Sequence, residues 1–342
     1  MAYTTIDKPT DYFNTKLYTG NGSTNNITGV GFQPDWVWIK QRSIAQNHLL
    51  FDSLRGATKW LESNGTAGEQ TYAPMLTSFD SNGFSVGNSG DINGSGVTLV
   101  SWNWLAGGTA SSNSNGSITS SVSANTTAGF SIVSWTGTGS NATVGHGLGA
   151  VPKMYIVKDR DASSNWNSYH VALSDNNKVV KLNTTDAETQ SGSWNNTAPT
   201  SSVFSLGTSS TINASGNDFI AYCFAEKKGY SKFGSYEANN NTDGPFVYTG
   251  FKPSLLILKA IDQTGNWFIF DNKRDTDNAV SQILYPDLSS SEDSASVLDF
   301  VSNGVKIRNS GSGGINHSGT YIYMAFAENP FVTSKGIPGT AR

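Results

Sequence analysis

The feature that most constrains the fold of this chain of 342 residues is a pattern that occurs three times. Each occurrence contains a proline followed by an apolar run that ends at a lysine, and later a turn with the sequence Ile-Asn-x-Ser-Gly. The prolines are Pro34, Pro152 and Pro253, and the turns lie at 92–96, 212–216 and 315–319. Both landmarks recur at nearly the same distances, so the sequence predicts three diverged units of about 100 residues, a usual size for a compact domain.

The first of these turns has part of the spacing of a calcium-binding loop, because Asp91 and Asn93 alternate as oxygen ligands would. The twelfth position of such a loop requires a bidentate glutamate, and the residue there is Trp102. The other two turns have Thr211 and Gly314 in place of the aspartate. We therefore interpret the pattern as a structural turn, and we expect no metal ion and no cofactor.

The segments between the turns are rich in β-branched and aromatic residues and contain few long helix-forming stretches. They predict an all-β protein of three tandem antiparallel β-sandwich units, of jelly-roll or lectin-like type. The proline-anchored run is apolar on both faces in every unit, so we expect it in the middle of a sheet that is covered on both sides. In the first unit we expect strands at 13–18, 36–40, 48–52, 58–61, 75–79, 83–87 and 98–104, although 52–59 could instead form a short helical turn.

The landmarks also predict the domain boundaries. Residues 107–128 consist mostly of Ser, Asn, Thr and Gly, a composition typical of a linker or a loosely held strand. The predicted segments are an N-terminal arm (1–12), repeat 1 (13–106), the linker (107–128), repeat 2 (129–228), repeat 3 (229–330) and a C-terminal tail (331–342). Pro9 favours an extended conformation for the arm.

Composition excludes several classes of function. Charged residues make up 14% of the chain and the net charge is −4, so a basic surface for nucleic acid is not expected. Hydrophobic residues reach 37%, enough to fill cores. No apolar stretch approaches the length of a membrane span, and the N-terminus lacks the features of a signal peptide. The single cysteine, Cys223, lies in an apolar segment and is expected to be buried.

Catalytic residues were sought among the repeated positions. Asp52, His170 and Asp271 occupy one column, each eighteen residues after its proline. Because the second unit has histidine there, no unit offers the pair of carboxylates that glycoside hydrolysis needs. The four histidines are scattered, and the Gly-x-Ser-x-Gly motif is absent. We expect no enzymatic activity, although a Ser-His-Asp arrangement of distant residues stays open.

The residues best suited to bind a glycan are Trp194, Asn195 and Asn196. An exposed indole ring can stack on the C–H face of a sugar while neighbouring amides bond its hydroxyl groups. Trp166 and Trp267 share a repeat column, which favours core or sheet packing over a binding role.

Several stretches resemble a repeat module of virion structural proteins from marine bacteriophages. That family is described as tail-fibre-like and as similar to concanavalin A-like lectins. The matching stretches span nearly the whole chain and include FQPDWVWIKQR, FDSLRG, SFDSNGFSVG, GHGLGAVPKMYIVKDR and NDFIAYCFAEKKGYSKFGSY. They mark a module rather than an activity, so function follows from them only by association.

The resemblance implies a protein on the virion surface, made in the host cytoplasm. Its role would be that of a tail fibre or receptor-binding module that attaches to host cell-surface glycans. Phage fibres and tips of this kind are usually homotrimers, and the N-terminal arm would bind other virion proteins. A capsid or tail decoration protein with a structural role only is the first alternative, and a glycan depolymerase is the second.

Overall fold

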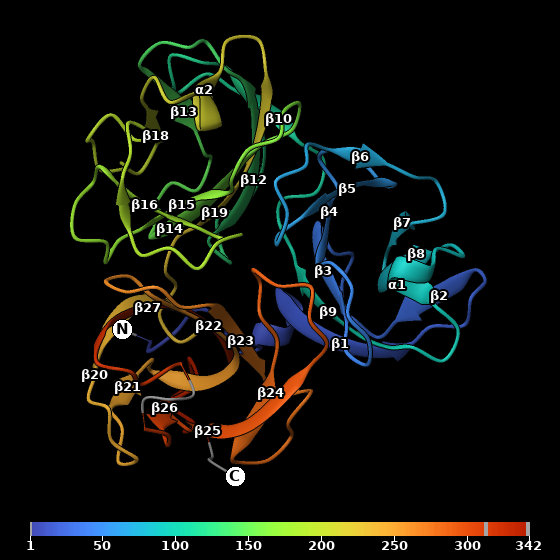
Figure 1. The fold of residues 1–342 in the computed structure, drawn as a ribbon, viewed down its shortest axis with the longest axis vertical. Coiled ribbons are helices and arrows are strands. Elements are labelled where there is room, and N and C mark those ends of the chain that lie inside the picture. The colour runs from blue at the N-terminus through green and yellow to red at the C-terminus, as the bar shows by residue number, and fades with distance from the viewer. Residues whose placement is uncertain (1, 311–313, 340–342) are drawn as a thin grey trace.

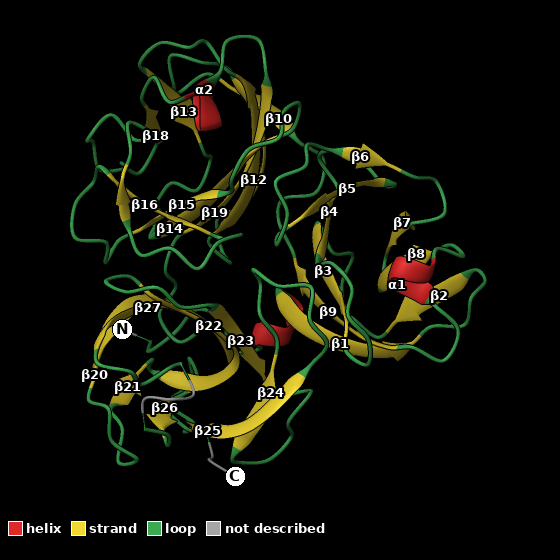
Figure 2. Cartoon of the chain, viewed as in Figure 1, coloured by secondary structure: helices red, strands yellow, loops and turns green. Residues whose placement is uncertain are grey.

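The computed structural model describes residues 2–310 and 314–339. The chain forms three lobes around a common centre (Figure 1), and strands make up nearly all of its regular structure (Figure 2). The helices of the described residues are a 3-10 turn, η1 (Pro9–Asp11), and two single-turn helices, α1 (Gly90–Asn93) and α2 (Ser210–Asn213). Each lobe consists of two antiparallel sheets around an apolar core, which confirms the all-β prediction. We call the lobes sheet pairs 1, 2 and 3.

Sheet pair 1 contains all the strands predicted for the first unit, each within two residues of its expected bounds. The larger sheet has the order β1-β9-β3-β4-β5-β6, with β1 (Phe13–Thr19), β3 (Trp36–Gln41), β4 (Leu49–Asp52), β5 (Lys59–Glu62), β6 (Gln70–Thr71) and β9 (Thr98–Trp104). The smaller sheet has the order β2-β8-β7, with β2 (Asn25–Thr28), β7 (Leu76–Asp80) and β8 (Gly83–Val86). The Gly56 amide donates to the Asp52 carbonyl at 3.1 Å, so one helical turn precedes β5.

Sheet pair 2 has the largest sheet of the molecule and the smallest one. The first has the order β10-β11-β12-β19-β14-β15-β16-β17, with β10 (Ser111–Asn113), β11 (Ser120–Asn125), β12 (Phe130–Thr136), β14 (Met154–Asp159), β15 (Asn167–His170), β16 (Lys178–Lys181), β17 (Thr189–Gln190) and β19 (Asp218–Phe224). The second pairs β13 (Ala142–Gly145) with β18 (Val203–Leu206).

Sheet pair 3 consists of two four-stranded sheets. One has the order β20-β27-β22-β23, with β20 (Ser231–Ala238), β22 (Phe251–Ala260), β23 (Trp267–Asp271) and β27 (Gly319–Pro330). The other has the order β21-β26-β25-β24, with β21 (Phe246–Tyr248), β24 (Val280–Ile283), β25 (Asp293–Val301) and β26 (Gly304–Ile307).

One sheet of each pair contains the same strand order: β1-β9-β3-β4, β12-β19-β14-β15 and β20-β27-β22-β23. The register is shared as well, since Trp38, Ile156 and Ile257 pair with Trp102, Tyr222 and Met324 respectively. We call residues equivalent when they hold the same place in this register.

The proline-anchored runs form the central strands β3, β14 and β22, and their inner faces share one core. Trp36 and Trp38 point to the centre of the molecule, whereas Val37 and Ile39 point into the core of sheet pair 1. The residues equivalent to these four divide in the same way, and together they account for a run that is apolar on both faces. The central strands are therefore covered on both sides, as predicted.

The lysine that ends each run is fully buried. Lys40, Lys158 and Lys259 each donate from Nζ to the carbonyl of the next residue, at 2.8–2.9 Å. Burial lowers the pKa of each ammonium group to about 8.

Backbone hydrogen bonds close the three sheet pairs into a ring. The three equivalent bonds are Glu69 N to Arg160 O (2.6 Å), Glu188 N to Ile261 O (2.7 Å) and Glu292 N to Arg42 O (2.8 Å). One bond lies at each of the three interfaces, so every sheet pair contacts both others through the same surfaces.

The Ile-Asn-x-Ser-Gly turns have an architectural role. Their asparagines, Asn93, Asn213 and Asn316, are fully buried. Each side chain donates to a backbone carbonyl six or seven residues earlier and accepts from a backbone amide of the loop after β1, β12 or β20. Because each amide is satisfied by backbone groups, it is not free to bind a metal ion.

Three predicted segments differ from the structure. Residues 107–128 are not only a linker, because β11 pairs with β12 from Ser121 to Asn125 and buries Val122. The segment 1–12 is not a free arm: Ile6 lies in the central core, and the Tyr3 hydroxyl donates to the Gly250 carbonyl at 2.7 Å. The described part of the C-terminal tail packs beside it, with the Ser334 amide donating to Asp7 at 2.6 Å.

Candidate functional site

The column of Asp52, His170 and Asp271 lies at the three interfaces. The Asp52 carboxylate is fully buried, forms an ion pair with Arg55 and accepts a hydrogen bond from the Tyr222 hydroxyl of sheet pair 2 at 2.8 Å. Asp271 is equally buried, forms an ion pair with Arg274 and accepts from the Trp102 indole of sheet pair 1 at 3.0 Å. Each carboxylate therefore joins two sheet pairs.

His170 takes the same place between sheet pairs 2 and 3. Its Nε2 donates to the Tyr323 carbonyl at 3.1 Å, and its Nδ1 accepts from the Ala172 amide at 3.1 Å. Burial lowers the pKa of the imidazole to about 4, so the ring is neutral at pH 7. The column thus holds the ring of sheet pairs together, and its members lie at separate interfaces rather than in one site.

The residues predicted to bind a glycan lie in two different environments. Trp194 is fully buried against Tyr155, with the ring centroids 4.9 Å apart, and its indole donates to the Lys178 carbonyl at 3.1 Å. A ring without an exposed face cannot stack on a sugar, so the structure assigns Trp194 to the core. Asn195 and Asn196 are exposed beside it.

Trp194 has a specific reason to be buried. It lies in the segment before β18. The equivalent segments of sheet pairs 1 and 3 form the strands β7 and β25, which pair with β8 and β26. In sheet pair 2 the smaller sheet has two strands only, and the indole packs into the core in that region.

Trp166 and Trp267 contribute to interfaces, as the shared repeat column indicated. Their indole nitrogens donate to the Glu62 carbonyl at 2.7 Å and to the Lys181 carbonyl at 2.9 Å, each on the neighbouring sheet pair. The equivalent His48 accepts from the Trp38 indole at 2.9 Å, and its Nε2 faces the backbone of Tyr285 without a well-formed hydrogen bond.

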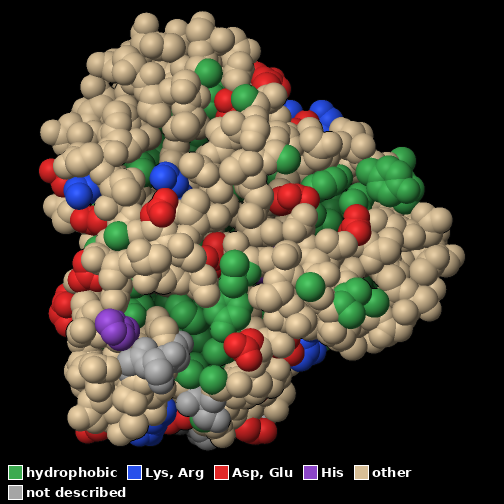
Figure 3. All heavy atoms as spheres, in the orientation of Figure 1, with side chains coloured by type: hydrophobic (Ala, Val, Ile, Leu, Met, Phe, Trp, Pro, Cys, Tyr) green, Lys and Arg blue, Asp and Glu red, His purple; other side chains and the backbone are tan. Residues whose placement is uncertain are grey.

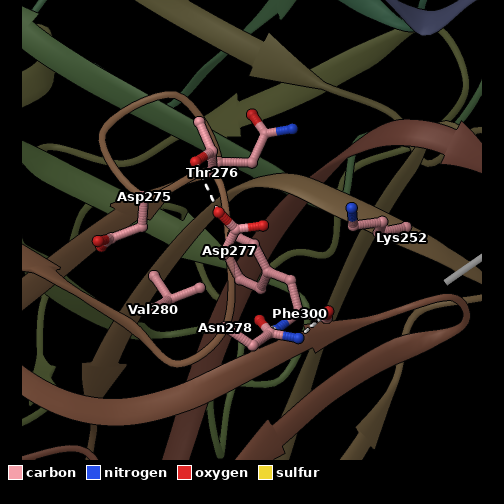
Figure 4. Close-up of a pocket in the computed structure, with 8 residues that line it drawn as sticks. Lys252, Asp275, Thr276, Asp277, Asn278, Val280 and Phe300 are labelled. Atoms are coloured by element: carbon pink, nitrogen blue, oxygen red, sulfur yellow. Dashed lines mark hydrogen bonds between the residues drawn. The ribbon is translucent and has the colours of Figure 1, made fainter. Parts of the chain in front are cut away.

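A recess opens at one end of sheet pair 3 and has a volume of about 230 Å³. Lys252 lines it from the start of β22, and the loop between β23 and β24 lines the other side (Figure 4). That loop is longer than its counterpart in sheet pair 1: Leu284 is thirteen positions after Asp271, whereas the equivalent Leu61 is nine positions after Asp52. The extra residues build the wall of the recess.

Two polar side chains hold this wall in place. Asp275 accepts from the amides of Ser281 and Gln282 at 2.8 and 2.6 Å. Asn278 makes a reciprocal pair with the backbone of Phe300, at 2.9 Å in both directions. Their hydrogen-bonding capacity serves the loop, so other groups must contact a ligand.

The remaining polar groups of the recess are of both hydrogen-bonding types. The Asn272 Oδ1 has no hydrogen-bond partner, and the carboxylate of Asp277 is exposed with one bond from the Thr276 hydroxyl at 3.1 Å. Lys252 pairs with Glu328 at 2.8 Å and supplies a cation. Donors and acceptors around one small recess match the hydroxyl groups of a saccharide.

The same sheet pair exposes two aromatic rings on the edge strand β21. Phe246 is 48% exposed and Tyr248 is 53% exposed, while Val247 between them is buried. The ring of Phe246 lies over Gly304, where a Cβ would be only 2.9 Å from its Cζ. The nearest atom to that Cβ would be the Val247 carbonyl oxygen at 2.2 Å, and a Cβ at the equivalent Gly83 of sheet pair 1 would lie at least as close to the Ile27 carbonyl oxygen. The close approach of the paired strand therefore requires the glycine in both sheet pairs.

The equivalent positions in the other sheet pairs carry no rings. They are Asn26 and Thr28 on β2, and Thr143 and Gly145 on β13. Exposed rings on this strand are therefore specific to sheet pair 3. No signal in the sequence singled out Phe246 or Tyr248, and nothing in it linked Lys252 to the distant loop of the recess.

On the face drawn in Figure 3, charged side chains of both signs are scattered among uncharged ones. Within the described residues, no three His, Cys, Asp or Glu side chains are placed to hold a metal ion. None of the helices formed by residues 2–310 and 314–339 has the length and hydropathy to cross a bilayer.

These features define a class of protein: a ring of three all-β sheet pairs, one of which carries a polar recess and an aromatic edge. The chain belongs to the family described as a domain of unknown function, DUF7483, which matches residues 8–330. No curated protein and no solved structure matches the chain.

Proposed function

We propose that the protein is a virion surface protein that attaches to host cell-surface glycans through sheet pair 3. The observation that carries this proposal is the recess beside β22, where an unpaired amide oxygen, an exposed carboxylate and an ammonium group converge on a rigid sandwich. Binding groups held on a rigid scaffold lose little freedom when the ligand binds.

The aromatic edge supports the same proposal. Tyr248 is only four positions before Lys252, so the exposed rings and the recess are joined by one short turn. Aromatic rings that are about half exposed suit the stacking of sugar rings. The bacteriophage resemblance of the sequence motifs supports the placement on a virion.

Glycan-array screening of the purified protein, followed by calorimetry on the best ligand, tests the proposal. The variant Asp277→Asn keeps the shape of the recess but removes its exposed charge, and Asn272→Ala removes the unpaired acceptor. We expect each to weaken binding by about 1–3 kcal/mol, because the first replaces a charge-assisted hydrogen bond to the ligand by a neutral one and the second removes an acceptor. Tyr72→Ala is the control for loss of an exposed side chain away from the recess, because this ring is 52% exposed on sheet pair 1.

Host-cell adsorption separates this function from the alternatives. A capsid or tail decoration protein would show no saturable binding to cells and no array signal, and that result would refute the proposal. Loss of viscosity of a host polysaccharide would instead reveal a depolymerase.

Assembly with other copies is part of the proposal. The apolar inner faces of the three sheet pairs are already buried within one chain, so a homotrimer would use outer surfaces. Sedimentation of the purified protein measures this directly, and a single species at the mass of one chain would refute the homotrimer.

A further inference from the structure

A second recess lies between sheet pairs 3 and 1 and has a volume of about 350 Å³. Its lining residues are Asn14, Thr15, Lys16, Leu17, Gly29 and Lys273. β1, which supplies four of them, is the edge strand of the larger sheet in sheet pair 1. Lys273 belongs to sheet pair 3, so the recess spans an interface.

Equivalent residues at the other two interfaces are apolar. Thr15 corresponds to Ile132 and Phe233, which are both buried in the central core. Lys273 corresponds to Leu54 and Ala172, which both pack against that core. The interface between sheet pairs 3 and 1 therefore has a hydroxyl and an ammonium group where the others have hydrophobic side chains.

Asn14 donates to the Val30 carbonyl at 3.0 Å, but three other polar side chains of this recess lack partners among the described residues. The Thr15 hydroxyl is buried, with the residue 5% exposed, and it has no hydrogen-bond partner. Neither Lys16 nor Lys273 forms an ion pair with any residue that the structure describes. Natural proteins rarely leave a buried hydroxyl unsatisfied, because burial without a hydrogen bond costs free energy.

Gly29 leaves room for one of these ammonium groups. A Cβ at this position would lie 3.1 Å from the Lys16 Nζ, and the backbone φ of +82° strains any other residue. The glycine thus lets the Lys16 head group lie at the recess. Two cations and one hydroxyl donor without an acidic partner form a site for a negatively charged oxygen group.

We propose that this recess binds an oxyanion, either the carboxylate or sulfate group of an acidic saccharide or a free anion of the same chemistry. The saccharide source rests on the proposed attachment to glycans, whereas the anion site itself does not. Lys16 and Lys273 supply the charge, and the Thr15 hydroxyl donates a hydrogen bond.

Calorimetry with three probes tests this site: inorganic sulfate, an oligomer of galacturonic acid, and the neutral galactose oligomer of the same length. We expect the acidic oligomer to bind, with an affinity that falls as salt is raised. Tighter binding of the acidic oligomer than of sulfate assigns the anion to a saccharide, and equal binding assigns it to a free anion.

Variants that copy the other interfaces provide the sharpest test. Lys273→Leu and Thr15→Ile introduce residues that sheet pairs 1 and 2 carry at these positions, so both are compatible with the fold. Each is expected to weaken binding of the acidic probe by about tenfold or more, since a charge-assisted hydrogen bond is worth about that much. Lys153→Gln, a half-buried lysine without an ion pair on sheet pair 2, is the control and should change binding less than twofold.

The outcomes separate the two proposals. Absence of any anion binding, or binding that Lys273→Leu leaves unchanged, overturns the oxyanion site even if neutral glycans bind sheet pair 3. Anion binding that depends on Lys273, in a protein that binds no glycan on the array, supports the site and refutes the glycan function alone.

Discussion

At the interface between sheet pairs 1 and 2, the buried Asp52 carboxylate accepts a hydrogen bond from Tyr222 and pairs with Arg55. At the interface between sheet pairs 2 and 3, the neutral His170 donates to the backbone carbonyl of Tyr323. The residue equivalent to Tyr222 is Met324 there, and a methionine side chain has no hydrogen to donate. A carboxylate at this interface would thus lack a donor across it.

An arginine accompanies the aspartate at two interfaces and is absent from the interface that has the histidine. Arg55 and Arg274 lie three residues after their carboxylates, and Leu173 holds the equivalent place after His170. A buried arginine beside a neutral histidine would be an unpaired charge, which is costly in a protein interior. Three residues therefore vary together at each interface: the aspartate or histidine, the residue three positions after it, and the residue that faces it across the interface. Each must match the hydrogen-bonding type of the others.

Removal of the carboxylate should have the largest effect. Asp52→Ala removes the buried carboxylate beside the Arg55 guanidinium and leaves it only the more distant Glu69 at 3.5 Å. We expect the free energy of unfolding to fall by about 3–5 kcal/mol. Guanidinium chloride denaturation at pH 7 measures it. Equal stability of the variant and the natural protein would contradict the interface role of this residue.

Protonation of His170 at low pH should have the next largest effect on the free energy of unfolding. Its folded pKa is about 4, against an ordinary value of 6.5, so between these values the unfolded chain takes up a proton that the folded chain excludes. Its stabilising contribution is complete above pH 6.5 and is lost as the pH falls towards 4, up to about 3 kcal/mol.

Denaturation at pH 7 and at pH 4.5 checks this when the natural protein is compared with His170→Asn, whose amide can donate and accept but does not titrate. The variant should lose less stability between the two pH values. An identical loss in both proteins would assign the pH dependence to other groups, such as the buried His48.

Removal of the donor across the first interface should have an intermediate effect. Tyr222→Phe deletes the hydroxyl that bonds Asp52, and we expect a loss of about 1.5–3 kcal/mol, as for a hydrogen bond to a charged group. The control is Tyr230→Phe, because the Tyr230 hydroxyl is buried without a hydrogen-bond partner. That variant should be as stable as the natural protein or more stable.

The smallest change in stability is expected at the aromatic edge. The double variant Phe246→Asn and Tyr248→Thr introduces the residues that sheet pair 1 carries at the equivalent positions. Both rings are about half exposed, so the free energy of unfolding should change by no more than about 0.5 kcal/mol, as measured by thermal or chemical denaturation. Binding on the glycan array should nevertheless weaken, and a large loss of stability would instead give the rings a structural role.

Much of the fold could be predicted from the sequence because its strong signals are local. The apolar runs, the prolines and the column of Asp52, His170 and Asp271 indicate where strands such as β3 and β4 lie. The short polar strands β6, β10 and β11 were missed or assigned to a linker. Their pairing depends on the neighbouring strands rather than on their own composition.

The candidate site was harder to predict. The neighbours of Trp194 suggested an exposed ring, but the missing third strand that leaves room for it is visible only when the sheets are compared. The recess of sheet pair 3 combines Lys252 with a loop twenty residues later and with Phe300. No periodic pattern in the sequence links residues so far apart.

The central core, to which all three sheet pairs contribute, limits how this protein can be dissected. A single lobe cut out by truncation would expose the tryptophans and other large side chains of its inner face to water. We expect such a fragment either to aggregate or to recruit two further fragments and rebuild the missing walls. The practical unit for expression, labelling or transplantation into another scaffold is accordingly the whole ring.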